Sequence, residues 1–140
     1  TNPCWLRDGK LYLRVVDYKT GRAKSGPTSV EGIFDASGHN AHGYYLQTFL
    51  YSLIMSQEQP DMPVSPGLFY VLSATDAHAY DPTLRIGKET VTDIRTFADA
   101  YTEGLQRVLA EIYDPTRPFV QTGDEQGACK FCDFRRLCGR

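Results

Sequence analysis

Apolar residues recur along this chain with two spacings, and the alternating one predicts strands. Residues 11–17 read Leu-Tyr-Leu-Arg-Val-Val-Asp, a run of branched and aromatic side chains typical of a strand. The Asp8-Gly9 pair ahead of it favours a tight turn, so we expect a hairpin whose other arm lies within residues 1–7 or before them. Further strands are expected at residues 67–74 and, shorter, at residues 85–86.

The second spacing, with apolar residues three and four apart, predicts helices over residues 42–56 and 90–113. Thr92 is a candidate N-cap of the second helix, and Pro115 and Pro118 end it. The side chains expected to face inward are Leu46, Phe49, Leu50, Leu53 and Ile54 in the first helix, and Ile94, Phe97, Ala98, Tyr101, Leu105, Val108, Leu109 and Ile112 in the second. Two smaller features complete the pattern: a short helix over residues 29–34 and a loop marked by Pro60, Pro63 and Pro66.

The order of strand, helix, strand and helix predicts an α/β fold. At 140 residues, with 41% hydrophobic and 23% charged residues, the chain fits one domain with a modest core. No apolar run approaches the length of a membrane span, and secretion is not indicated. The net charge of −2 gives no general attraction to nucleic acid, so any such contact must come from a local basic patch.

The first predicted strand ends in Asp17-Tyr18-Lys19. Residues two apart on a strand point to the same side, so Asp17 and Lys19 project together while Tyr18 faces away. A carboxylate can hold a hard divalent cation, with the Tyr18 carbonyl as a further oxygen ligand, and an amine can orient or deprotonate a water. The alternative reading is an ordinary surface salt bridge of little energetic worth.

Gln47 and Tyr51 lie four residues apart in the first long helix and are therefore neighbours on one face. An amide and a phenol beside the apolar stripe can hydrogen-bond a phosphate or orient a metal site. The alternative is a glutamine at the solvent border and a tyrosine that packs its ring with the hydroxyl exposed.

Three of the four cysteines lie in the last twelve residues, in the pattern Cys129-x₂-Cys132-x₅-Cys138. This crowding suits one metal centre better than a disulfide framework, and it indicates a reducing, cytoplasmic compartment. Thiolates select Zn²⁺ or iron–sulfur clusters. Three ordinary buried cysteines are the alternative, which the polar residues around them disfavour.

Asp-Tyr-Lys-Thr-Gly on a strand, followed by Tyr44-x-x-Gln47-x-x-x-Tyr51 on a helix, resembles the PD-(D/E)XK nucleases of the RecB and AddB type. The resemblance implies a restriction-endonuclease-like core, a mixed central sheet flanked by helices and truncated at the N-terminus. It makes Asp17 a metal ligand, Lys19 the catalytic lysine, and Gln47 with Tyr51 the supporting pair. Residues 1–120 would form the C-terminal part of the nuclease core and residues 121–140 a cysteine-rich metal-cluster tail.

The tail is similar to the 4Fe–4S staple of AddB-type nucleases, which implies Cys129, Cys132 and Cys138 as cluster ligands. The fourth ligand would be Cys4 or a cysteine upstream of this chain. The second metal-binding Asp of the family, in a Gly-x-Ile-Asp-Arg stretch, has no counterpart here, so it is either truncated or lost. We therefore expect this chain by itself to be inactive or nearly so.

The resemblance implies a Mg²⁺-dependent (or Mn²⁺-dependent), exonuclease-like deoxyribonuclease that serves as the nuclease module of a DNA-repair helicase–nuclease, with DNA and a helicase subunit or domain as partners. Three other readings stay open: a CRISPR-associated four-cysteine nuclease, a non-catalytic DNA-binding or scaffolding domain derived from a nuclease fold, and a zinc-binding interaction module. The candidate phosphate contacts are Arg22, Lys24, Arg135 and Arg136, each of which can equally be a solvated charge.

Overall fold

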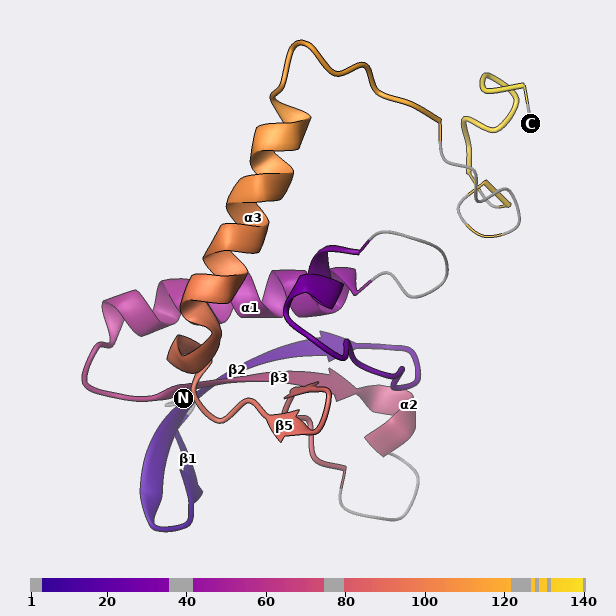
Figure 1. Ribbon diagram of the computed structural model, residues 1–140. Coiled ribbons are helices and arrows are strands. Elements are labelled where there is room, and N and C mark those ends of the chain that lie inside the picture. The colour runs from indigo at the N-terminus through magenta and orange to yellow at the C-terminus, as the bar shows by residue number, and fades with distance from the viewer. Residues whose placement is uncertain are drawn as a thin grey trace.

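The computed structural model describes residues 4–35, 42–74, 80–121, 127, 129, 130 and 132–139. A three-stranded sheet has the order β1–β2–β3, in which β1 pairs antiparallel and β3 parallel with β2 (Figure 1). The predicted mixed α/β fold is confirmed. Its elements are β1 (Cys4–Arg7), β2 (Lys10–Lys19), η1 (Glu31–Phe34), α1 (Gly43–Glu58), β3 (Val64–Tyr70), α2 (Val71–Ala74), β4 (Arg85–Ile86), β5 (Glu89–Thr90), η3 (Ile94–Phe97) and α3 (Ala98–Ile112).

The hairpin of β1 and β2 is confirmed, with Arg7 opposite Lys10 across a two-residue turn. Both turn residues have positive φ, 49° at Asp8 and 72° at Gly9. Glycine takes this backbone conformation without steric strain, and aspartate tolerates it better than most other residues. The local sequence therefore fixes the hairpin register and, through it, the sides to which the β2 side chains point.

The strand predicted at residues 67–74 is shifted, because β3 runs from Val64 to Tyr70 and the chain then turns into α2. β2 ends at Lys19, opposite Tyr70, so residues beyond Tyr70 find no strand to pair with. Pro66, predicted to lie in a loop, sits inside β3. Its carbonyl points away from β2 and accepts from Leu84 N. The N–H and C=O of one strand residue point to the same side, so the N–H that proline lacks would also have faced away from β2.

The long helix predicted from residue 90 begins later, and Thr92 is not its N-cap. Thr90 belongs to β5, where it pairs with Arg85 of the predicted short strand. Asp93 caps the following turn η3, its carboxylate accepting from Arg95 N at 3.2 Å. α3 then ends at Ile112, ahead of the two prolines as predicted. The pairing of β4 with β5 overrides the helical spacing of the first residues.

α1 lies along one face of β2 and β3, and α3 crosses α1 and projects away from the sheet (Figure 1). The aromatic centre of this packing is formed by Phe49 and Tyr101, both fully buried with ring centroids 5.6 Å apart. Phe34 of η1, from the predicted short helix, packs on Tyr101 and fills the space that a side chain at Gly104 would need.

Three residues expected to face inward do not. Ile54, Leu109 and Ile112 keep 47%, 44% and 48% of their surface exposed. Ile54 lies on the exposed side of α1. The last turns of α3 extend beyond the elements against which its first turns pack (Figure 1). Among the described residues, no helix combines the length and the apolar character needed to cross a bilayer.

Candidate active site at the end of the second strand

Asp17 and Lys19 point to the same side of β2, as the strand alternation predicts. Asp17 Oδ2 lies 2.7 Å from Lys19 Nζ, and both side chains are largely buried, with 20% and 18% of their surfaces exposed. Tyr18 faces the other side of the sheet, where its ring lies 5.4 Å from that of Phe69 and stays 69% exposed. The acid and the amine thus form a sheltered ion pair rather than a solvated surface pair.

α1 brings Gln47 and Tyr51 to this ion pair. Lys19 Nζ donates to Gln47 Oε1 at 3.4 Å, and Gln47 Nε2 donates to Tyr51 Oη at 2.9 Å. The amide orientation is fixed by its neighbours, since a flipped amide would turn its NH₂ group toward the ammonium. The four side chains proposed from the sequence therefore form one connected polar chain, although Lys19 and Gln47 are 28 residues apart.

Tyr44 is a further member of the site that sequence reasoning did not assign a role. Lys19 Nζ lies 4.1 Å from the centroid of its ring, an arrangement in which the ring face attracts the cation. The spacing held a usable signal, because Tyr44 precedes Gln47 by three residues and so shares its helix face. The ammonium is thus held from three directions, by Asp17, Gln47 and Tyr44.

Asp17 also meets one requirement of a metal ligand. Its Oδ2 is buried and, although within ion-pair distance of Lys19, makes no hydrogen bond in the described residues. A buried carboxylate oxygen with unused acceptor capacity suits a hard cation. Mg²⁺ is commonly held by one or two carboxylates with water and substrate phosphate. The described part of the chain gathers no three His, Cys, Asp or Glu side chains that could hold a metal ion, so Asp17 would act with other oxygens.

The cysteines are not brought together in the part of the chain that the structure describes. Cys129 is half-buried, whereas Cys4, Cys132 and Cys138 are exposed, and all four are free thiols. Cys132 N donates to Cys129 O at 3.3 Å. Cys4 lies in β1, well apart from the tail (Figure 1). The cluster assignment of residues 121–140 stays a prediction, because residues 122–126, 128, 131 and 140 lie outside the described residues.

The candidate phosphate contacts, Arg22, Lys24, Arg135 and Arg136, are all exposed. Lys24 borders a cavity of about 290 Å³. The cavity also takes in Tyr70, the residue opposite Lys19 in the sheet. Local positive charge is therefore available beside the polar chain of Asp17, Lys19, Gln47 and Tyr51, in spite of the negative net charge.

Residues 6–139 match the family model of the PD-(D/E)XK nuclease superfamily. The match covers nearly the whole chain, and the chain belongs to this superfamily. Comparison with curated proteins and with solved structures found no match. Membership defines the class of protein as a nuclease, that is, a phosphodiester hydrolase of a family that usually uses divalent metal ions.

Proposed function

We propose that this chain carries the catalytic strand and the supporting helix of a Mg²⁺-dependent or Mn²⁺-dependent deoxyribonuclease. One observation carries the proposal: Asp17, Lys19, Gln47 and Tyr51 are connected by contacts of 2.7, 3.4 and 2.9 Å at the end of β2. An ordinary solvated surface salt bridge does not require an amide and a phenol that are hydrogen-bonded in series to its ammonium. Membership in a nuclease superfamily gives this arrangement its chemistry.

The roles follow from the chemistry of each group. Asp17, with the Tyr18 carbonyl, would hold the cation, which when bound polarises the scissile phosphate. Lys19 directs an N–H toward the attacking water and offsets charge that develops on the phosphate oxygens. Gln47 accepts from Lys19 and thereby fixes the ammonium, and Tyr51 fixes the amide of Gln47 by accepting from Nε2. Gln47 and Tyr51 are positioning residues in this scheme.

The biological setting that we propose is the nuclease module of a cytoplasmic DNA-repair helicase–nuclease, in which a helicase subunit or domain delivers the DNA. Support comes from the Asp-Tyr-Lys-Thr-Gly strand and the Tyr44-x-x-Gln47-x-x-x-Tyr51 helix, which resemble nucleases of that type. We further propose that this chain needs additional acidic ligands for full activity, since Asp17 is its one carboxylate in the polar chain described above.

The test is cleavage of linear DNA by the intact protein in Mg²⁺, in Mn²⁺ and in excess EDTA. We expect cleavage with either metal and none with EDTA, because the phosphate then lacks its electrophilic partner. DNA binding without cleavage under all three conditions would instead support a non-catalytic DNA-binding or scaffolding domain.

We expect Gln47→Leu to lower kcat by about 10–100-fold, the range typical of groups that orient an active-site ligand. The variant keeps the side-chain volume but can no longer accept from Lys19 Nζ. Because Gln47 acts through Lys19, the pH profile of cleavage should shift while KM changes little. Gln57→Leu, at an exposed position of the same helix, is the matched control. An unchanged pH profile in Gln47→Leu would mean that Gln47 only supports the fold.

For residues 121–140 we propose that Cys129, Cys132 and Cys138 are three ligands of a 4Fe–4S cluster, the fourth being Cys4 or a cysteine upstream of it. The spacing and the hydrogen bond from Cys132 N to Cys129 O support this; the described residues do not gather the three thiols. Iron and acid-labile sulfide assays on protein purified without oxygen test it. If the assays find stoichiometric zinc and no sulfide, the tail holds a structural zinc site and the cluster proposal is wrong.

A further inference from the structure

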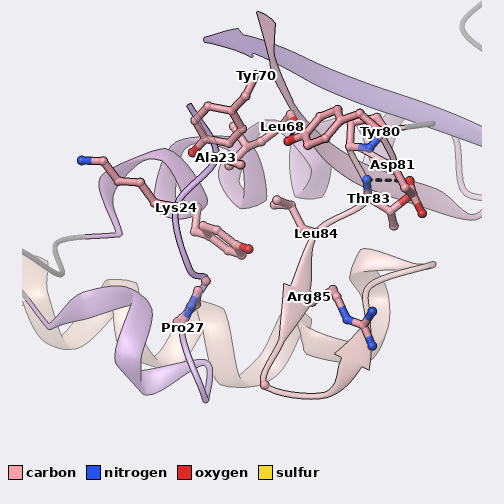
Figure 2. A pocket seen from close by; sticks show the side chains of 14 residues that line it. Ala23, Lys24, Pro27, Leu68, Tyr70, Tyr80, Asp81, Thr83, Leu84 and Arg85 are labelled. Atoms are coloured by element: carbon pink, nitrogen blue, oxygen red, sulfur yellow. Dashed lines mark hydrogen bonds between the residues drawn. The ribbon is translucent and has the colours of Figure 1, made fainter. Parts of the chain in front are cut away.

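A cavity of about 290 Å³ (Figure 2) is lined in part by β3, the strand that pairs with β2 of the candidate active site. Its buried wall is formed by Leu68 and Tyr70 of β3 together with Leu84, and Tyr45 and Tyr80 also line it. Ala23 and Lys24, from the loop that follows β2, border it on another side. The site proposed above uses none of these side chains.

The sheet register places this cavity one strand away from the proposed chemistry. Asp17 pairs with Leu68 and Lys19 pairs with Tyr70 in the parallel β2–β3 ladder. Residues paired in this way project to the same face, and neighbouring strands are about 4.8 Å apart. The negative charge of Asp17 contributes to raising the pKa of Tyr70, after burial and the neighbouring tyrosines. A single nucleotide backbone can cross this separation.

The tyrosines give the cavity a firm and uncharged lining. Tyr80 Oη donates to Leu68 O at 2.9 Å, and the Tyr80 ring packs edge-on against Phe69. The Tyr45 phenol hydrogen-bonds with the Arg85 backbone and fills the space beside Gly26. Burial raises the pKa of Tyr70 to about 12, and burial also raises the pKa values of Tyr45 and Tyr80. All three phenols are therefore neutral at physiological pH.

The charges at the rim favour binding of an anionic chain that places an apolar group in the cavity. Lys24 and Arg85 are exposed and border the cavity (Figure 2). Among the described residues that line the cavity, the acid is Asp81, and it is already engaged, because its Oδ1 accepts from Thr83 N at 2.9 Å and from Arg14 Nη2 at 3.1 Å. These hydrogen bonds hold the pKa of Asp81 below its usual range against the opposing effect of burial. Two cations are thus left to meet a phosphate backbone.

We propose that this cavity binds the base of the unpaired nucleotide adjacent to the cleaved phosphate. The inference rests on the proposed nuclease function and adds the form of the substrate. Aromatic and aliphatic walls suit the faces of a base, whereas rim cations suit the phosphates that flank it. A base within a duplex is stacked and paired and cannot enter without being extruded, so the site selects single-stranded or frayed DNA.

The first test compares cleavage of a single-stranded oligonucleotide with that of copies carrying one abasic nucleotide at successive positions. We expect kcat/KM to fall about 5- to 150-fold when the missing base is the one beside the cleaved bond, the range given by about 1–3 kcal/mol of stacking per base. Ala23→Trp, which fills the cavity from its exposed edge, should remove this dependence on the base. Ala110→Trp, an exposed alanine of α3, should preserve it.

The second test measures binding in EDTA, so that it does not depend on catalysis. Fluorescence anisotropy with a short labelled single strand should show weaker binding in Lys24→Ala and Ala23→Trp, and unchanged binding in the exposed Lys10→Ala. Equal affinity for blunt duplex and single strand, with Ala23→Trp indistinguishable from wild type in both tests, overturns the base site and leaves the nuclease proposal standing. If binding depends on the base but no metal-dependent cleavage is found, the cavity is a base-binding site and the nuclease proposal is wrong.

Discussion

Lys19→Ala is expected to lower the rate of Mg²⁺-dependent DNA cleavage by the intact protein by about 10²–10⁴-fold, the range associated with a positioned proton-transfer group. The ammonium is held by Asp17 at 2.7 Å, by Gln47 at 3.4 Å and by the Tyr44 ring at 4.1 Å. Nothing in an alanine side chain can replace the N–H groups that these contacts orient. Single-turnover cleavage of linear DNA, with protein in excess, measures the chemical step directly.

Two further variants show how Lys19 acts. Lys10→Ala removes an exposed lysine at the other end of the same strand and should leave the rate unchanged. Lys19→Arg keeps the charge but places a planar group that stays protonated where a compact ammonium stood. Partial activity in Lys19→Arg indicates electrostatic stabilisation, whereas loss equal to that of Lys19→Ala indicates proton transfer or exact placement. A wild-type rate in Lys19→Ala removes Lys19 from the mechanism.

Asp17→Asn is expected to abolish Mg²⁺-dependent cleavage while leaving the fold intact. The substitution keeps the shape of the side chain and removes the anionic oxygen that a hard cation requires. The apparent affinity for Mn²⁺, measured by calorimetry or electron paramagnetic resonance, should fall by more than the about 10–100-fold typical of groups that only support a ligand. High Mn²⁺ concentration should then recover part of the activity.

The control for Asp17→Asn is Asp61→Asn, which removes an exposed carboxylate before β3. It matches the change in net charge, so any general effect on DNA binding appears in both variants. Asp17→Asn also leaves the Lys19 ammonium without its acid, so cooperative thermal unfolding must be verified for both proteins. Undiminished Mn²⁺ affinity in a folded Asp17→Asn protein would show that the cation binds elsewhere.

Much of the local structure could be predicted because its causes are local. The Asp8-Gly9 turn and the alternation of β2 put Asp17 and Lys19 on one side, and the helical spacing of Gln47 and Tyr51 put that pair on one face. The errors lie at boundaries where distant segments decide. β3 ends at Tyr70 because its partner β2 ends at Lys19, and Thr90 lies in a strand, not in the predicted helix, because it pairs with Arg85.

The sequence by itself determined which side chains share a side of a strand or helix, since those periods follow from backbone sterics within a few residues. Those local periods could not determine that Lys19 meets Gln47, which only the family resemblance implied. Nor could they determine that the Tyr44 ring lies against the ammonium, or that Tyr70 lines a cavity beside the proposed site. Those contacts depend on the parallel pairing of β2 with β3 and on the packing of α1 over both strands. Such long-range choices are made by burial of the whole core, and no local pattern encodes them.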